Sequence, residues 1–417
     1  MKMKSKTLAL FIGIFLAVFT LSTIPIMTGA AKAASAPYKL GLVTSVTGFM
    51  SPMGSGARDV GKLVVDRINN QGGINGHPLE LIVYDDGSDP SKGVMAYKKL
   101  IGEDKVLGII GPVSTGIAMA CVPIAEKAGV PVFSLNSSSW VVALKPWNLP
   151  NPPTKIRHWI FKAGIDPIFL YQGMYSILKD QGATKIAHMN VNNAMGKAMR
   201  RALEASHERA GLKVVIWEEY GRQDTDLTVP LTKMKGTDFD AIVISGAEMA
   251  GAIAYKQARE MGITKPIVGM APLAMTQIVQ ALGTSLDGLM VGTFPVSLGD
   301  SLPANDPQRQ PVMELTKLVR ENTKQKRADT GHAAGWDGVY LYADALKRAN
   351  PDLSDLKKAR TQVRDAFATI KGFVGTQSVG DMTKWHEIPA PYIPVKLKDG
   401  KLVIIGKKGI PSWEDFQ

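Results

Sequence analysis

The sequence LELIVYDDGSDPSKGVMAYKKLIGEDKVLGII, residues 79–110, contains a strand pattern, a helix pattern and a second strand pattern in succession. Residues 79–84 and 106–110 are short apolar runs rich in β-branched side chains. Residues 90–101 have helical spacing, with Asp89 as N-cap and Pro90 at the first helical position. Such strand–helix–strand units are typical of parallel sheets.

The same alternation extends along the chain in two blocks separated by an irregular segment. Residues 143–154 hold four prolines and predict a long loop with no assigned role. The pattern therefore predicts an α/β protein with two doubly wound parallel sheets. The other predicted strands are 39–44, 130–134, 185–190, 213–218, 241–245, 266–269, 289–293, 394–397 and 401–405, and the other helices are 55–70, 115–127, 168–179, 197–210, 227–235, 247–261, 312–323, 336–348 and 362–369.

The first 33 residues have the organisation of a signal peptide. Lys2, Lys4 and Lys6 precede an apolar stretch, and Ala31-Lys32-Ala33 fits a small-residue cleavage site. We expect cleavage after Ala33, because the alternative after Ala36 would place Pro37 first in the mature chain. An uncleaved membrane anchor is the alternative interpretation.

Composition excludes several classes of protein. Removal of residues 1–33 leaves 45 basic and 37 acidic residues, a net charge of +8, without basic runs interleaved with aromatics, so nucleic acid is not expected as a partner. The single cysteine, Cys121, cannot form an intramolecular disulfide and is too far from the signal to be lipidated. The histidines show no metal-ligand spacing, and no nucleophile elbow or P-loop is present, so neither enzyme, metal nor cofactor is predicted.

Two clusters have both a functional and a structural interpretation. Gly54-Ser55-Gly56 lacks dinucleotide-binding spacing, and it indicates either a backbone that approaches a ligand or a tight turn into a helix. Asp85, Asp86 and Asp89 lack the spacing of a calcium loop, and Asp89 is interpreted as a helix cap.

Several segments together resemble the solute-binding proteins of the branched-chain amino acid type. The resemblance covers essentially the whole mature chain, and its specificity comes from the order and spacing of motifs that are individually weak. The matching segments are INNQGGING (68–76), DDGSDP (85–90), IGP (110–112), PIAEKAGVP (123–131), DTD (224–226), KQAR (256–259) and WD (336–337).

The resemblance implies a type I periplasmic-binding fold, in which two lobes joined by a three-segment hinge close on a ligand. Lobe I would comprise residues 34–164 and 272–375, and lobe II residues 165–271 and 376–417, with crossings near Gly164, Met270 and Gly375. It also implies a monomeric periplasmic protein that delivers its ligand to an ABC permease in the inner membrane.

The resemblance places a carboxylate-binding wall in lobe I. Ser114 and Thr115, just past the Gly-Pro turn, match the positions that hold the ligand carboxylate, and helix amides suit an anion there. Asn136 and Ser138 match a second polar loop that contacts the ligand. The alternatives are helix capping by Ser114 and a turn without ligand contact.

The opposite wall departs from the family pattern. Glu248 is the candidate for the acidic residue that meets a ligand ammonium, although strict counting places Ala250 there. Met53 and Met195 stand where tyrosines are usual, and Phe294 is predicted as an aromatic wall. These departures favour a ligand with an apolar body.

The sequence therefore predicts the solute-binding component of an ABC importer that binds an apolar or branched-chain amino acid between its lobes. If Glu248 does not face the ligand, an aromatic or other amine-free organic acid is the alternative. A ligand-sensing receptor domain is a second class of function with the same fold.

Overall fold

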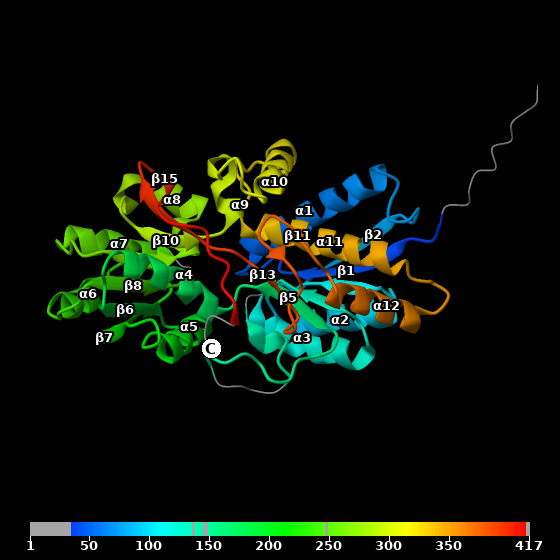
Figure 1. Cartoon of the computed structure of the whole chain (residues 1–417), viewed down its shortest axis with the longest axis horizontal. Helices are drawn as coiled ribbons and strands as arrows, with labels where there is room; N and C mark the ends of the chain where they lie inside the picture. The colour runs from blue at the N-terminus through cyan, green and yellow to red at the C-terminus, as the bar shows by residue number, and fades with distance from the viewer. Residues whose placement is uncertain (1–34, 136–137, 145–148, 247–248, 414–417) are drawn as a thin grey trace, which may run out of the picture. The chain divides into compact units, whose positions relative to one another are not determined.

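The computed structural model describes residues 35–135, 138–144, 149–246 and 249–413. Two large sheets organise these residues, and each combines parallel strands with covering helices (Figure 1). We call each sheet with its helices a lobe. Strand order is β2-β1-β3-β4-β5 in the first sheet and β7-β6-β8-β9-β10 in the second, so both repeat one doubly wound pattern.

The first sheet is parallel throughout, and β13 adds its sixth strand beside β5. Its apolar side chains alternate between two hydrophobic clusters, one under α1, α11 and α12 and the other under α2 and α3. The strands are β1 (Tyr38–Thr44), β2 (Leu79–Asp85), β3 (Gly108–Ile110), β4 (Val132–Ser134), β5 (Ile160–Gly164) and β13 (Glu387–Pro389), and the helices are α1 (Ser51–Asn70), α2 (Pro90–Gly102), α3 (Thr115–Ala128), α9 (Pro295–Leu298), α10 (Arg309–Asn322), α11 (Thr330–Ala349) and α12 (Leu356–Ala368).

The second sheet has five parallel strands and an antiparallel hairpin at its edge. One cluster packs it against α4 and α5, and the other against α6, α7 and α8. Its elements are α4 (Pro167–Asp180), β6 (Lys185–Val191), α5 (Ala194–Ser206), β7 (Lys213–Tyr220), α6 (Thr228–Lys235), β8 (Ala241–Ser245), α7 (Met249–Glu260), β9 (Ile267–Met270), α8 (Thr276–Leu282), β10 (Met290–Thr293), β14 (Ile393–Lys398) and β15 (Lys401–Ile404).

Small elements complete the described chain. A two-stranded antiparallel sheet, β11 with β12, follows α12, and short 3-10 turns connect several of the longer elements. These are β11 (Phe373–Val374), β12 (Val379–Gly380), η1 (Ser139–Val141), η2 (Ala271–Ala274), η3 (Gly283–Leu286) and η4 (Gly299–Ser301).

The α/β prediction is confirmed, but two strands lie outside the predicted lobe boundaries. β10 falls in the segment assigned to lobe I, yet it pairs with β9 and β14 of the second sheet. β13 falls in the segment assigned to lobe II, yet it pairs with β5 of the first sheet. The chain therefore crosses after Thr293 instead of near Met270, because α8 returns it to the sheet that it has just left. It crosses back after Pro389 instead of near Gly375, because β13 still pairs with β5.

Close packing of α1 against α11 depends on two glycines of α11. A Cβ on Gly331 would lie 2.5 Å from the Met53 carbonyl oxygen, and one on Gly335 would lie 2.3 Å from that of Ala57. The two backbones therefore approach to a distance that any larger side chain would prevent. This contact fixes α1 over the first sheet and so positions the loop between β1 and α1.

Asp337, in the Trp-Asp motif, has a structural role in the first lobe. Its buried carboxylate accepts backbone hydrogen bonds from Thr376, Gln377 and Ser378 at 2.6–3.0 Å and a further bond from the Thr376 hydroxyl. Burial raises the pKa of Asp337, and these four donors oppose that shift. The motif thus holds the segment that follows β11 against α11.

Candidate functional site

The strand order places a crevice at the carboxyl end of each sheet. In a doubly wound sheet, ligands bind where the order reverses, which here is between β1 and β3 and between β6 and β8. The segments that leave β1, β3 and β4 meet at this edge of the first lobe, and the amide of Leu135 donates to the Pro112 carbonyl at 3.2 Å. The predicted loops after β3 and β4 are therefore neighbours.

The loop after β3 presents the start of a long helix. Gly111 has a φ of +104° and a cis peptide bond to Pro112, and a Cβ on it would lie 1.9 Å from the Val43 carbonyl oxygen. Ser114 then takes the N-cap position of α3 in an extended conformation, but its side chain makes no capping hydrogen bond. The first intrahelical amide bond runs from Ala118 to the Ser114 carbonyl, so the preceding amides have no helical partner.

Some helices of the described chain have side-chain caps, whereas α1, α6, α8 and α10 begin without one, as α3 does. Side-chain oxygens of Asp89, Asp166 and Asn193 accept amide hydrogen bonds at the starts of α2, α4 and α5. The half-buried hydroxyl of Ser114 remains available beside the uncapped amides of α3. A helix N-terminus of this kind favours an anion.

The loop after β4 is partly described. Ser138 is half-buried, and its hydroxyl accepts a hydrogen bond from the Trp140 amide at 3.4 Å as the N-cap of η1. Trp140 itself keeps 37% of its surface exposed. Asn136 lies outside the described residues, so its predicted contact stays a prediction.

The loop after β1 forms the neighbouring wall and is held by Asp85. This carboxylate accepts hydrogen bonds from the amides of Val46, Thr47 and Gly87 and from the Thr47 hydroxyl, at 2.6–3.1 Å. Partial burial would raise the pKa of Asp85, but these four donors lower it on balance. Asp85 therefore organises the loop as an anion.

The remaining carboxylates of this cluster also act within the first lobe. Asp86 is buried and accepts from the Ser45 hydroxyl at 2.5 Å and the Ser88 amide at 2.9 Å, and burial raises its pKa. Asp89 caps α2 as predicted, through the amides of Ser91 and Lys92. Among the residues described, no group of three or more His, Cys, Asp or Glu side chains is arranged to hold a metal.

Met53 and Met195 occupy equivalent places in the two lobes. Each lies in the first turn of the helix after the first strand of its sheet, and each precedes a glycine. A Cβ on Gly54 would lie 2.0 Å from the Ser45 carbonyl oxygen, and one on Gly196 would lie 1.6 Å from that of Val191. The contact of Gly54 supports the interpretation of the glycine-rich sequence as a tight turn into a helix, because this glycine permits a close approach of α1 to the end of β1.

The residues predicted for the opposite wall of the site lie in different surroundings. Met195 is half-buried and packs against the cluster under α4 and α5. Phe294 leaves only 7% of its surface exposed and packs in the core of the first lobe, which differs from the predicted aromatic wall. Glu248 lies outside the described residues, while Ala250 is buried in α7.

A contact joins the carboxyl-end segments of the two lobes. The guanidinium of Arg222, which follows β7, lies 5.3 Å from the ring centroid of Phe49, which precedes α1. Phe49 keeps 57% of its surface exposed, so this cation–π pair lies at the molecular surface.

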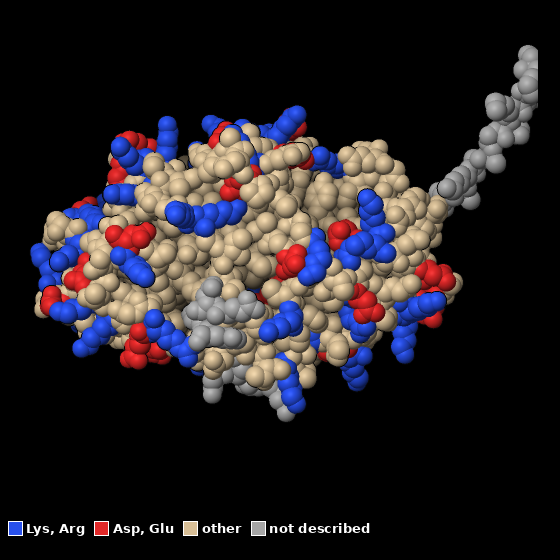
Figure 2. Space-filling view, in the orientation of Figure 1, with Lys and Arg blue, Asp and Glu red and all other residues tan. Residues whose placement is uncertain are grey.

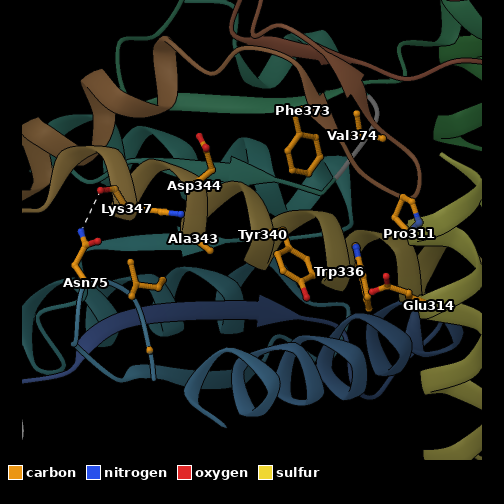
Figure 3. Close-up of a pocket in the computed structure, with 12 residues that line it drawn as sticks. Asn75, Pro311, Glu314, Trp336, Tyr340, Ala343, Asp344, Lys347, Phe373 and Val374 are labelled. Atoms are coloured by element: carbon orange, nitrogen blue, oxygen red, sulfur yellow. Dashed lines mark hydrogen bonds between the residues drawn. The ribbon is translucent and has the colours of Figure 1, made fainter. Parts of the chain in front are cut away.

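A surface pocket of about 540 Å³ lies elsewhere on the first lobe (Figure 3). Trp336 and Tyr340 of α11, Phe373 of β11 and Asn75 before β2 line it, and Asn75 donates to the Lys347 carbonyl at 3.0 Å. Residues before β2 belong to the amino end of the sheet, whereas the predicted contacts follow the carboxyl ends. None of the predicted ligand residues that the structure describes lines this pocket.

The surface is mixed in charge. On the face that Figure 2 shows, Lys and Arg side chains alternate with Asp and Glu over both lobes, without a continuous basic area. Among the described residues, no helix combines the length and the hydrophobicity needed to span a bilayer.

Comparison with known proteins identifies the family. The periplasmic binding protein family model matches residues 37–401. The chain belongs to this family. Its members are solute-binding proteins, and the type I fold predicted from the sequence is confirmed.

Curated relatives and solved structures agree with this assignment. The Leu/Ile/Val-binding protein BraC3 of Rhizobium johnstonii is 25% identical over 66% of this chain and 71% of its own length. A leucine-, isoleucine-, valine-, threonine- and alanine-binding protein of Pseudomonas aeruginosa is 22% identical over 84% of this chain and 90% of its own length.

Among solved structures, the substrate-binding protein LivJ of Streptococcus pneumoniae in complex with isoleucine has a TM-score of 0.72 and 24% identity, covering 90% of this chain and 99% of LivJ. An extracellular ligand-binding receptor of Rhodopseudomonas palustris has a TM-score of 0.74 and 22% identity, covering 89% of this chain and 99% of the receptor. These similarities establish the fold.

Proposed function

We propose that this chain is the periplasmic solute-binding component of an ABC-type importer, and that it is not an enzyme. It binds a small carboxylate with an apolar body between its lobes and delivers it, as a monomer, to a permease. The observation that carries the proposal is the uncapped start of α3, where Ser114 leaves its hydroxyl and the following amides available at the carboxyl end of β3.

The first candidate ligand is a branched-chain or other apolar amino acid. The names of the Rhizobium and Pseudomonas relatives support this class of ligand. In this assignment Ser114, Thr115, Asn136 and Ser138 hold the carboxylate, and Met53 and Met195 contact the apolar side chain. Glu248 then meets the ammonium group.

An amine-free organic acid, such as an aromatic carboxylate, is the second candidate. It is favoured by Ala250, which replaces the acidic residue at the strict family position and is buried in α7. Without a second carboxylate, the site would have no partner for a ligand ammonium, and desolvation of that charge would oppose binding.

Isothermal titration with leucine, isoleucine, valine and benzoate tests the proposal. We expect micromolar or tighter binding of one class. Ser114→Ala should weaken it about 10- to 100-fold, since one hydrogen bond to a charged group is lost. Ser176→Ala is the control, because that hydroxyl bonds only the Gly173 carbonyl within its own helix, at 2.9 Å, among the contacts described.

The outcome separates the two candidates. Glu248→Gln should abolish binding of an amino acid and leave binding of benzoate unchanged. Absence of heat and of a melting shift with all four compounds would refute this ligand class, and unchanged affinity in Ser114→Ala would refute the role of α3.

A further inference from the structure

A buried polar cluster joins two of the three places where the chain passes between the lobes. We call Ser139, Lys162, Asp166, Glu387 and Trp413 the hinge network. Asp166 lies between β5 of the first lobe and α4 of the second, and Glu387 begins β13, after which the chain leaves for β14. All five side chains are buried, with 3% or less of their surfaces exposed.

Ser139 connects the two passages. Its amide donates to Asp166 Oδ2 at 2.7 Å, and its hydroxyl donates to Glu387 Oε1. The other Asp166 oxygen caps α4 through the Ile168 amide at 3.1 Å. Ser139 directly follows Ser138, so the proposed ligand wall adjoins both passages.

The hinge network also contains a buried ion pair. Lys162 and Glu387 are paired residues of β5 and β13, with Nζ and Oε1 3.3 Å apart. Burial raises the pKa of Glu387, Lys162 and the Ser139 hydroxyl oppose this, and the nearby charge of Asp166 adds to it. Loss of the Trp413 indole would leave the buried Oε2 of Glu387 without its donor, which is costly, whereas Oε1 has both Ser139 and Lys162 as partners.

Trp413 links Glu387 to the second lobe. The residue follows β15, and its indole N–H donates to Glu387 Oε2 at 3.0 Å. Its ring packs edge-on against Phe169 of α4, with centroids 4.9 Å apart. Rotation of α4 relative to β13 must therefore change either the hydrogen bond or the ring contact.

We propose that the hinge network sets the equilibrium between open and closed arrangements of the two lobes, with Trp413 as the element whose contacts differ between them. Ser139, Asp166, Glu387 and Trp413 are positioning residues in this scheme, since they act through Ser138 and the hinge. The inference rests on the proposed function only for its link to ligand binding.

Distance measurement between spin labels in the ligand-free protein tests the proposal. Labels are attached to Met95→Cys of α2 and Val229→Cys of α6, which lie in different lobes and expose 57% and 69% of their surfaces. Native Cys121 should remain unlabelled, because it is buried and desolvation raises its pKa to about 12.

Trp413→Phe retains an aromatic ring and removes the N–H donor. We expect the ratio of short to long distances to change by about three- to tenfold, the effect of one buried hydrogen bond that only one arrangement keeps. Glu387→Gln should also shift the ratio, and it provides a second test if Trp413→Phe does not fold.

Tyr342→Phe is the matched control, since it also removes one buried donor while keeping the ring. Its hydroxyl bonds the Ile109 and Pro131 carbonyls in the core of the first lobe, at 3.0 and 2.7 Å. It should lower stability without changing the distances. Distances identical to wild type in both hinge variants would overturn the proposal, whereas failure of all ligands to bind wild type would overturn only the proposed function.

Discussion

Acid should destabilise this protein partly through one histidine of the second lobe. His188 lies in β6 and is fully buried, with Nε2 3.0 Å from the Tyr171 hydroxyl and 2.9 Å from that of Ser245. Burial, assisted by the charge of Arg200, lowers its pKa from 6.5 to about 3. The folded protein therefore keeps this imidazole neutral where the unfolded chain protonates it.

The sign and size of the effect follow from this difference. As pH falls below 6.5 toward 3, the unfolded chain binds a proton that the folded protein does not, so stability is lost across this window. Each unit of difference corresponds to about 1.4 kcal/mol. The contribution of His188 should therefore be a loss of about 2 kcal/mol between about pH 8 and about pH 5.

Urea denaturation of His188→Leu at the two pH values measures this contribution. The substitution lowers stability at both, but the drop in unfolding free energy on acidification should be about 2 kcal/mol smaller than in wild type. Tyr171→Phe is the control, since it removes a hydrogen bond and keeps the imidazole buried, and it should retain the acid sensitivity. Equal pH dependence in wild type and His188→Leu would refute the reasoning.

Three substitutions test the contacts that shape the first and second lobes, with urea denaturation as the measurement. Asp89→Ala should cost about 1 kcal/mol, because the amides at the start of α2 lose their cap. Asp337→Asn should cost about 3 kcal/mol, because an amide cannot accept all four hydrogen bonds of the carboxylate. Gly196→Ala should cost about 1–3 kcal/mol, since its Cβ would overlap the Val191 carbonyl, whereas Gly102→Ala, which meets nothing within 4 Å, should be nearly neutral. An unchanged unfolding midpoint in any of the first three would contradict the contact assigned to it.

Local sequence patterns predicted most elements because each strand and helix of a doubly wound sheet carries its own periodicity. The strand β5 was not predicted, since Lys162 interrupts its apolar run. That lysine is buried because Glu387 pairs with it, and a partner more than 200 positions away has no local signature.

The candidate site was also only partly predictable from the sequence. The positions of Ser114, Thr115 and Ser138 at the carboxyl end of the first sheet could be predicted because each follows a strand, whereas their contact with a ligand stays a prediction. The burial of Phe294 could not, because it depends on how the segment after β10 packs against the first lobe. Residue type alone does not distinguish an exposed aromatic wall from a core residue.

The pairing of β13 with β5 has a consequence for biosynthesis. Ser139 and Glu387 lie 248 residues apart in sequence, and Ile109 and Tyr342 lie 233 apart, with the strands of the second lobe between them. During translation, β5 therefore has an unpaired edge until β13 has been made, and long-range closure of this kind is slow. Because β14 and β15 of the second sheet follow β13, neither sheet is complete until the last part of the chain has been made, and an open strand edge of this kind favours aggregation in the meantime.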